Sequence, residues 1–236
     1  MERAVTAAVL VTEGAPLVKR SSRMYAGAGG VLLLSSVALT GSLVSTSAAA
    51  GSAAEAVNLR ADLAHMNNSG VIGNAQLVSL GGRLNVQIDA RGFLKGMPHA
   101  QHIHYGNQAR NECPNVAMDD RNNDHRLNTV DGNPAYGQIR KSLTTRGDAS
   151  PASALAIDRF PTTPRGVMHY DRTIKVKGDN LRRGIRDGEA VLVIHGLDYN
   201  GNGKYDFRGA GKSELDPSLP AEATDPAACG RIRITH

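Results

Sequence analysis

The sequence predicts an all-β protein, an antiparallel β-sandwich or barrel. Segments 57–63 and 84–90 alternate apolar with polar side chains, which is the period of a strand with one buried face. A shorter segment, 75–80, lies between them and is joined to 84–90 by the tight turn Gly81-Gly82. Hairpin-linked strands with one apolar face each favour a sandwich or a barrel around a common core.

The later part of the chain continues this pattern. Residues 190–194 form the most apolar run after residue 50, which is typical of a central strand. The other expected elements are a polar loop over 107–136, short apolar stretches at 141–145 and 154–160, a strand at 172–177, a helical turn at 181–185, an irregular segment up to 226 and a closing strand at 229–234.

Residues 1–50 do not follow the pattern of strands. A basic cluster at 19–23 precedes a weakly polar run over 26–46, which ends in small residues. A positive region, an apolar region and an A-x-A site follow one another in this way in secretory signal peptides. We expect cleavage near Ala50 to Ala54 and a mature protein that is secreted, extracellular or held in the cell envelope. An uncleaved anchor is the alternative, which the Gly, Ser and Thr content of the run disfavours.

The remaining residues, 51–236, are enough for a single β domain with its own core. The whole chain has a formal net charge of +5, and its basic residues are scattered along the sequence. It contains no Trp and three Phe, so aromatic platforms for stacking bases are scarce. We therefore expect no nucleic-acid partner and no membrane span in the mature protein.

The segment 98–104 carries the first candidate metal ligands. His102 and His104 are two residues apart, so on a strand they project from the same face and can supply two adjacent metal ligands. His99 has the opposite parity and is expected to act as a hydrogen-bonding support. His195 ends the apolar run at 190–194, where a lone His is usually packed or solvated. An isolated H-x-H is also often a packed or surface pair, and both interpretations stay open on these residues alone.

Two cysteines, Cys113 and Cys229, lie in the part expected to be exported. In an oxidising compartment an even pair usually forms a disulfide. A bridge between them would close a long loop, which stabilises a fold by on the order of 4–5 kcal/mol in the chain-entropy treatment. Two free thiols or a Cys metal ligand are the alternatives.

Two Asp/Asn-rich segments have the spacing of a calcium-binding loop. The first starts at Asp120 but has His125 where Gly is usual, and the second starts at Asp198 and lacks the final acid, since Gly209 stands there. The alternative is a polar surface loop whose side chains cap turns. The candidate calcium ligands are Asp120, Asn122, Asp124, Asn128 and Asp131 in the first loop, and Asp198, Asn200, Asn202 and Asp206 in the second.

The order of these features resembles the copper/zinc superoxide dismutase family, including its divergent bacterial members and the neighbouring CHRD-type domains. His102-Ile103-His104 resembles the H-x-H copper pair of the family, and His99 falls where a supporting His precedes that pair. His195, at the end of its apolar strand, resembles the third copper ligand. Cys113 and the Cys229-Gly230 strand match the positions of the family's disulfide. The resemblance covers roughly residues 57–234 and implies a Greek-key β-sandwich or barrel.

The chain departs from the family pattern at the zinc site and the substrate channel. Asp119 stands where the family has a His that bridges the two metals, and Pro226 stands where it has an arginine that guides the substrate. The cluster of zinc ligands is missing, with His125 the only His in that loop and His169 far beyond it. We therefore expect no zinc cofactor, and the first calcium-like loop occupies the place of the zinc loop.

Two functions follow from these observations. The first is a secreted superoxide dismutase-like protein that binds copper through three His residues and converts superoxide to oxygen and hydrogen peroxide. Its activity would be weak without the bridging His, and Lys204, Arg208 and Lys212 could attract superoxide or another small anion. The alternative is a non-catalytic extracellular β-sandwich, stabilised by calcium and a disulfide, that binds partners or sequesters copper. A hydrolase is disfavoured, since no G-x-S-x-G nucleophile elbow occurs.

Overall fold

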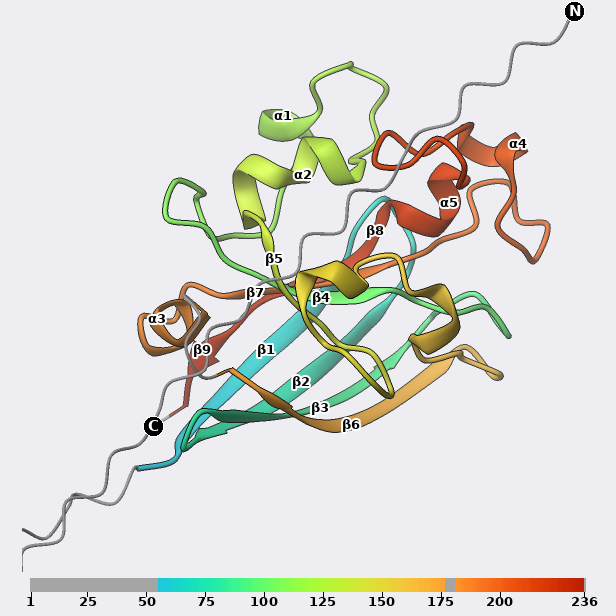
Figure 1. The fold of residues 1–236 in the computed structure, drawn as a ribbon. Coiled ribbons are helices and arrows are strands. Elements are labelled where there is room, and N and C mark those ends of the chain that lie inside the picture. Colours follow the sequence, from blue (N-terminus) through green and yellow to red (C-terminus); the bar gives the residue numbers. More distant parts are fainter. Residues whose placement is uncertain (1–54, 177–180, 236) are drawn as a thin grey trace, which may run out of the picture. The chain divides into compact units, whose positions relative to one another are not determined.

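The computed structural model describes residues 55–176 and 181–235 (Figure 1). The predicted signal peptide over 1–50 and its cleavage positions Ala50 to Ala54 lie outside the described residues. Within the described ranges, no helix has the length and hydropathy needed to cross a membrane.

The described residues contain nine strands, all joined in antiparallel pairs, so the all-β prediction is confirmed. The order across the sheet is β5-β4-β7-β8-β1-β2-β3-β6, and β9 pairs with β1. The strands are β1 (Val57–His65), β2 (Ile72–Leu80), β3 (Arg83–Arg91), β4 (Gln101–His104), β5 (Ile139–Ser142), β6 (Val167–Lys175), β7 (Val191–His195), β8 (Pro226–Arg231) and β9 (Arg233–Ile234).

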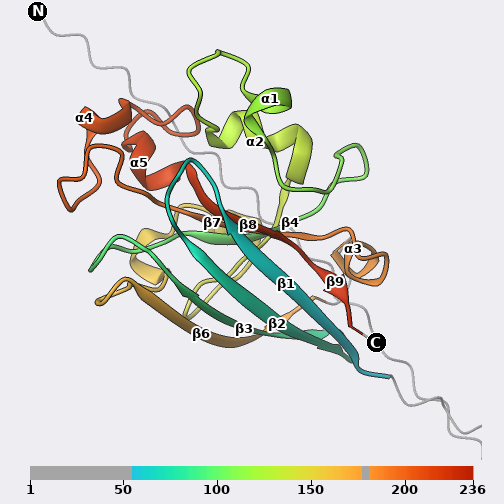
Figure 2. The ribbon, with the colours of Figure 1, turned by 180° about the vertical axis from the view of Figure 1, so that it is seen from behind.

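The sheet is folded into two layers that β1 joins. Residues 57–63 of β1 pair with β2, whereas Ala64 and His65 pair with β8. One layer is therefore the meander β1-β2-β3 extended by β6, and the other contains β4, β5, β7 and β8 (Figures 1 and 2). This arrangement is the β-sandwich that the sequence predicts; the Greek-key topology of the dismutase type stays a prediction.

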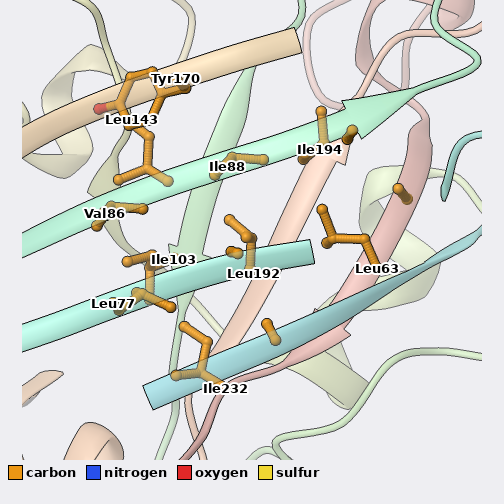
Figure 3. Close-up of a cluster of buried hydrophobic side chains, with 14 of the residues drawn as sticks. Leu63, Leu77, Val86, Ile88, Ile103, Leu143, Tyr170, Leu192, Ile194 and Ile232 are labelled. Carbon is orange, nitrogen blue, oxygen red and sulfur yellow. The ribbon is translucent and has the colours of Figure 1, made fainter. Parts of the chain in front are cut away.

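The core lies between the two layers, as Figure 3 shows. On β1, Leu59, Ala61 and Leu63 are buried while the residues between them are exposed, as the alternation predicts. Ile103 of β4 and Leu192 of β7 point into the same core from the other layer. Because side chains alternate along a strand, the neighbours of Ile103 and Leu192 must point to the opposite face.

That opposite face of β4, β7 and β8 is covered rather than solvated. Residues 105–138, 150–160 and 196–225, which we call the outer layer, supply the segments that pack on or next to it (Figure 1). As a result, every residue of β4 and β7 is buried. The outer layer is fastened to β8 by a disulfide between Cys113 and Cys229, whose Cα atoms are 5.7 Å apart, and this pairing confirms the prediction.

The outer layer contains short helices where the sequence analysis expects loops. They are α1 (Val116–Asp119), α2 (Thr129–Tyr136), α4 (Phe207–Ala210) and α5 (Ala221–Thr224), with single 3₁₀ turns at η1 (Pro151–Ser153) and η2 (Ile157–Arg159). The prediction of a continuous loop over 107–136 is therefore wrong, and the reason is local. Asn128 accepts hydrogen bonds from the first amides of α2, and Asp131 accepts one from the Asn128 amide, so together they form a capping box. The expected helical turn at 181–185 is confirmed as α3 (Leu181–Arg186).

Candidate metal centre

Three imidazoles meet on the outward face of the second layer. His102 and His104 come from β4 and His195 from the neighbouring strand β7, which runs antiparallel to β4. One nitrogen from each ring, Nδ1 or Nε2, lies within 4.8 Å of one nitrogen of each of the other two rings. All three side chains are buried, with exposed fractions of 3%, 2% and 3%. The structure thus brings together the three residues that the sequence analysis selects from distant segments.

Each of these rings is held by one backbone carbonyl of the outer layer. His102 Nε2 lies 3.1 Å from the Ala154 oxygen, and His104 Nδ1 lies 2.8 Å from the Gly137 oxygen. His195 Nδ1 lies 2.6 Å from the Thr224 oxygen. A carbonyl oxygen can only accept, so the ring nitrogen facing it carries the hydrogen. The tautomer of each imidazole is fixed in this way.

The remaining ring nitrogens are lone-pair acceptors without a hydrogen-bond donor. His102 Nδ1, His104 Nε2 and His195 Nε2 are buried and have no partner among the described residues. These are the nitrogens that a metal ion would use, because metal-bound His usually donates its other N–H to a carbonyl or carboxylate. Burying such a group unpaired destabilises a fold by roughly 1–3 kcal/mol. The donor set therefore fits a metal ion, which would satisfy all three nitrogens at once.

The three imidazoles are neutral over a wide pH range. Burial lowers the pKa of His104 to about 3 and that of His195 to about 4. Burial also lowers the pKa of His102 well below its ordinary value, and repulsion from the other two rings lowers it further. Only a neutral imidazole can bind a metal, so protons do not compete for this site near neutral pH.

The surroundings of the site are mainly apolar. The His104 ring packs on Tyr136 at 4.4 Å between centroids, and the His102 ring packs on Phe160 at 5.5 Å. A hollow of about 10 Å³ reaches His102 and His195 from outside. Its other lining residues are Ala100, Thr129, Ile139, Ala154, Leu155, Ile157, Leu215, Ala223 and Thr224. None of these is Lys or Arg, so the expected attraction of an anion by Lys204, Arg208 or Lys212 does not act from the lining of this hollow.

His99 does not belong to the group of three. It is fully buried, and its Nδ1 lies 3.0 Å from the backbone oxygen of His195. Its Nε2 lies 3.3 Å from the Leu94 oxygen, and the Tyr205 hydroxyl approaches the same ring. His99 therefore contacts the backbone of His195 without being one of the three grouped imidazoles, and its role as a support stays a prediction.

The other residues of the resemblance lie outside the metal centre. Asp119, in the place of the family's bridging His, accepts two hydrogen bonds from one nitrogen of Arg110 at 2.7 and 2.8 Å. His169 is exposed and pairs with Asp89 at 2.6 Å. The three-His group contains neither His169 nor His125.

The predicted ligands of the first calcium-like loop make two kinds of contact. The side chains of Asp120 and Asn122 accept hydrogen bonds from the Asp124 amide at 3.3 and 3.2 Å. The Asp124 carboxylate pairs with Arg126 at 2.6 Å. The last two predicted ligands, Asn128 and Asp131, cap α2 instead, as described above.

The second calcium-like loop is more closely tied together. Asp198 accepts hydrogen bonds from the three successive amides of residues 201–203, at 2.7–3.2 Å. Asn200 and Asn202 donate their side-chain amides to Asp206 at 3.2 and 2.7 Å. Position 6 is left-handed in both loops, with φ of +84° at Gly203 and +63° at His125. The two loops therefore have the same left-handed backbone conformation at position 6. That they bind calcium stays a prediction.

Sequence reasoning missed the buried carboxyl groups next to the second loop. Glu222 is fully buried and accepts hydrogen bonds from the amides of Tyr199 and Asp206, both at the ends of that loop. Asp225 is 1% exposed and accepts a hydrogen bond from the Tyr199 hydroxyl at 3.0 Å. Burial raises the pKa of Asp225 to about 7. The segment that carries both carboxyls has no periodic pattern, so no local signal marks them as buried.

Comparison with known proteins does not identify a family for this chain. No protein-family model matches the chain, and no curated protein matches it either. The fold and the site define a disulfide-containing β-sandwich with a three-His group that could hold a metal ion.

Proposed function

We propose that this protein binds copper through His102, His104 and His195. Two observations carry the proposal: one nitrogen from each of the three rings lies within 4.8 Å of the other two, and each ring has one buried nitrogen without a hydrogen-bond partner among the described residues. Three imidazoles are a donor set that suits copper, and among divalent first-row metals Cu(II) binds nitrogen ligands most tightly. Bound copper would supply one-electron chemistry, while the chain orients the rings through the carbonyls of residues 137, 154 and 224.

Copper analysis of the purified chain tests this proposal. The wild-type protein should retain one copper per chain after equilibrium dialysis. His104→Ala should lose copper affinity by more than roughly 100-fold, because loss of an outer-shell partner alone typically costs 10–100-fold. His169→Ala is the matched control, since His169 is exposed and lies outside the group of three. Near-UV circular dichroism should show that both variants are folded.

Two outcomes would refute copper binding at this site. One is a folded His104→Ala protein that retains as much copper as the wild type. The other is an equal loss of copper in His169→Ala, which would indicate binding at surface imidazoles. Nitrogen hyperfine splitting in the electron paramagnetic resonance spectrum of the Cu(II) form should accompany specific binding.

Superoxide dismutation, which the resemblance implies, is the second candidate function. The H-x-H pair and the late strand-end His support it, and the absence of a cation from the lining of the hollow argues for a slow reaction. Copper-loaded wild type and His104→Ala should be compared for the rate of superoxide removal. Equal rates would remove dismutation as a function of this site and leave copper binding untouched.

We also propose that the two Asx-rich loops bind calcium. Their common left-handed position 6 and the grouping of Asp198, Asn200, Asn202 and Asp206 support this proposal. Oxygen ligands in this spacing suit calcium, which accepts six to eight oxygens in flexible geometry. Calcium would serve the fold, because both loops belong to the outer layer that covers the imidazoles.

A further inference from the structure

We infer that the three-His site is built for cuprous rather than cupric copper, and that its opening favours small uncharged ligands over anions. The inference rests on the proposed copper binding and adds the oxidation state and the class of ligand. It is drawn from three features of the described residues: the charge of the donors, the space beside them and the character of the opening.

The donors carry no negative charge. All three ligands are neutral imidazoles, and no acidic residue lines the hollow beside them. The unfavourable energy of placing an ion in a low-dielectric interior rises steeply with its charge. A site of this kind therefore disfavours a doubly charged ion relative to a singly charged one.

The space beside the donors limits the coordination number. Cu(II) prefers a tetragonal set of nitrogen and oxygen ligands, so three nitrogens leave it short of ligands. A cavity needs roughly 10–15 Å³ to hold one water molecule, so the hollow of about 10 Å³ has room for about one small molecule beside His102 and His195. Cu(I) is satisfied by three ligands and needs no water. The hydrogen bonds that hold the rings also oppose the movement that would open room for further ligands.

The opening of the hollow selects against charged molecules. Leu155, Ile157 and Leu215 line it, and the first and last of these are 37% and 44% exposed, so apolar side chains surround the entrance. A hydrated anion would lose its water there without meeting a cation. A small neutral molecule such as carbon monoxide or dioxygen loses little on entry. The ligand class is therefore small and uncharged.

Competition titrations on the full chain test the oxidation state. Cu(I) affinity is measured under anaerobic conditions against bicinchoninate, and Cu(II) affinity against glycine. We expect Cu(I) to bind more tightly than Cu(II). The Cu(I) form should also show an infrared band of bound carbon monoxide, whereas azide should leave the visible spectrum of a Cu(II)-loaded sample unchanged.

A pair of variants tests whether the apolar opening causes the preference. Leu155→Glu places a carboxylate at the hollow. The ratio of the Cu(I) affinity to the Cu(II) affinity should shift toward Cu(II) by roughly tenfold, because Cu(II) carries one more unit of charge than Cu(I) and a partly buried carboxylate attracts it more strongly. Leu80→Glu is the matched control, because Leu80 is 48% exposed on β2 and does not line the hollow. It should leave the ratio unchanged.

The outcomes separate this inference from the proposed function. Tighter binding of Cu(II), or a spectral change with azide, would overturn the inference and leave copper binding intact. Equal ratios in Leu155→Glu and wild type would show that the opening does not set the preference, and would overturn that step. Failure of both ions to bind would remove the proposed function itself.

Discussion

The two faces of β4 and β7 differ in what they bury. The inner face contributes Ile103, Leu192 and Ile194 to the main cluster of buried apolar side chains. The outer face presents His102, His104 and His195 to a layer with several buried polar groups. The same strands therefore stabilise the fold on one side and hold three unpaired nitrogens on the other.

This difference shows how a β-sandwich can hold a group of unpaired imidazoles without weakening its core. Period-two alternation keeps the two sets of side chains apart, so a change on one face leaves the other face in place. The outer layer can cover and orient the imidazoles only while it stays attached to β4, β7 and β8. Attachment depends on one disulfide, a small apolar cluster around Leu127 and Tyr136, and hydrogen bonds to backbone carbonyls.

Removal of the disulfide should have the largest effect. Replacing Cys113 and Cys229 together with Ser should lower the free energy of unfolding by about 4–5 kcal/mol, because the bridge joins residues 116 positions apart and restricts the unfolded chain. Denaturant unfolding with and without reductant measures this. The outer layer should loosen first, so hydrogen exchange should rise in 105–138 more than in β2. Uniform exchange in both regions would contradict the separation of the two faces.

One part of the pH dependence of stability should come from Asp225 in the outer layer. The pKa of Asp225 is about 7 in the folded chain, against an ordinary value of 3.8. The folded state therefore binds the Asp225 proton more tightly than the unfolded state does. The stabilisation that results is fully present below about pH 4 and is lost as the pH rises through 7. The difference of about three pKa units corresponds to on the order of 4 kcal/mol.

Asp225→Asn should remove this dependence, because an amide stays uncharged and can still accept from Tyr199. The groups that act on the carboxyl besides Tyr199 are Arg126, Asp124 and Glu214. Between pH 4 and 8 the stability of the wild type, taken relative to that of the variant, should fall as the pH rises. The buried imidazoles, whose pKa values are lowered, add the opposite trend to both proteins equally. A wild-type stability that increases over this range, relative to the variant, would contradict the assignment.

A substitution on the inner face should weaken the fold without changing the site. Ile103→Ala should cost about 3 kcal/mol, since Ile103 is fully buried and leaves a cavity. Its neighbours His102 and His104 point to the other face, so copper affinity measured well below the unfolding transition should match that of the wild type. A large loss of copper in a folded Ile103→Ala protein would show that the two faces are coupled.

Calcium should have the smallest effect. At ten times its dissociation constant, a ligand that binds only the folded state stabilises it by about 1.4 kcal/mol. Calcium should therefore raise the melting temperature of the wild type, and should raise that of Asp198→Ala by less, because this variant keeps only the first loop intact. Asp171→Ala, an exposed acid on β6, is the control. A rise of equal size in all three proteins would point to nonspecific charge screening.

Local patterns in the sequence predicted much of the fold. Alternation over 57–63 and 84–90 predicts β1 and β3, because burial of one face requires period two. The same rule predicts that His102 and His104 share a face, and both do. The helix α2 was missed, although Asn128 and Asp131 have the spacing of a capping box.

Residue types and spacing alone therefore determined the strands, the parity of the H-x-H pair and a pair of cysteines able to form a bridge. Only the tertiary structure decided that His195 lies beside that pair, because β4 and β7 are adjacent in the sheet but some ninety residues apart in sequence. It also decided which nitrogen of each ring stays unpaired, since the carbonyls that fix the tautomers come from three separate segments. Such long-range contacts depend on how the whole sheet folds, which no short window of sequence records.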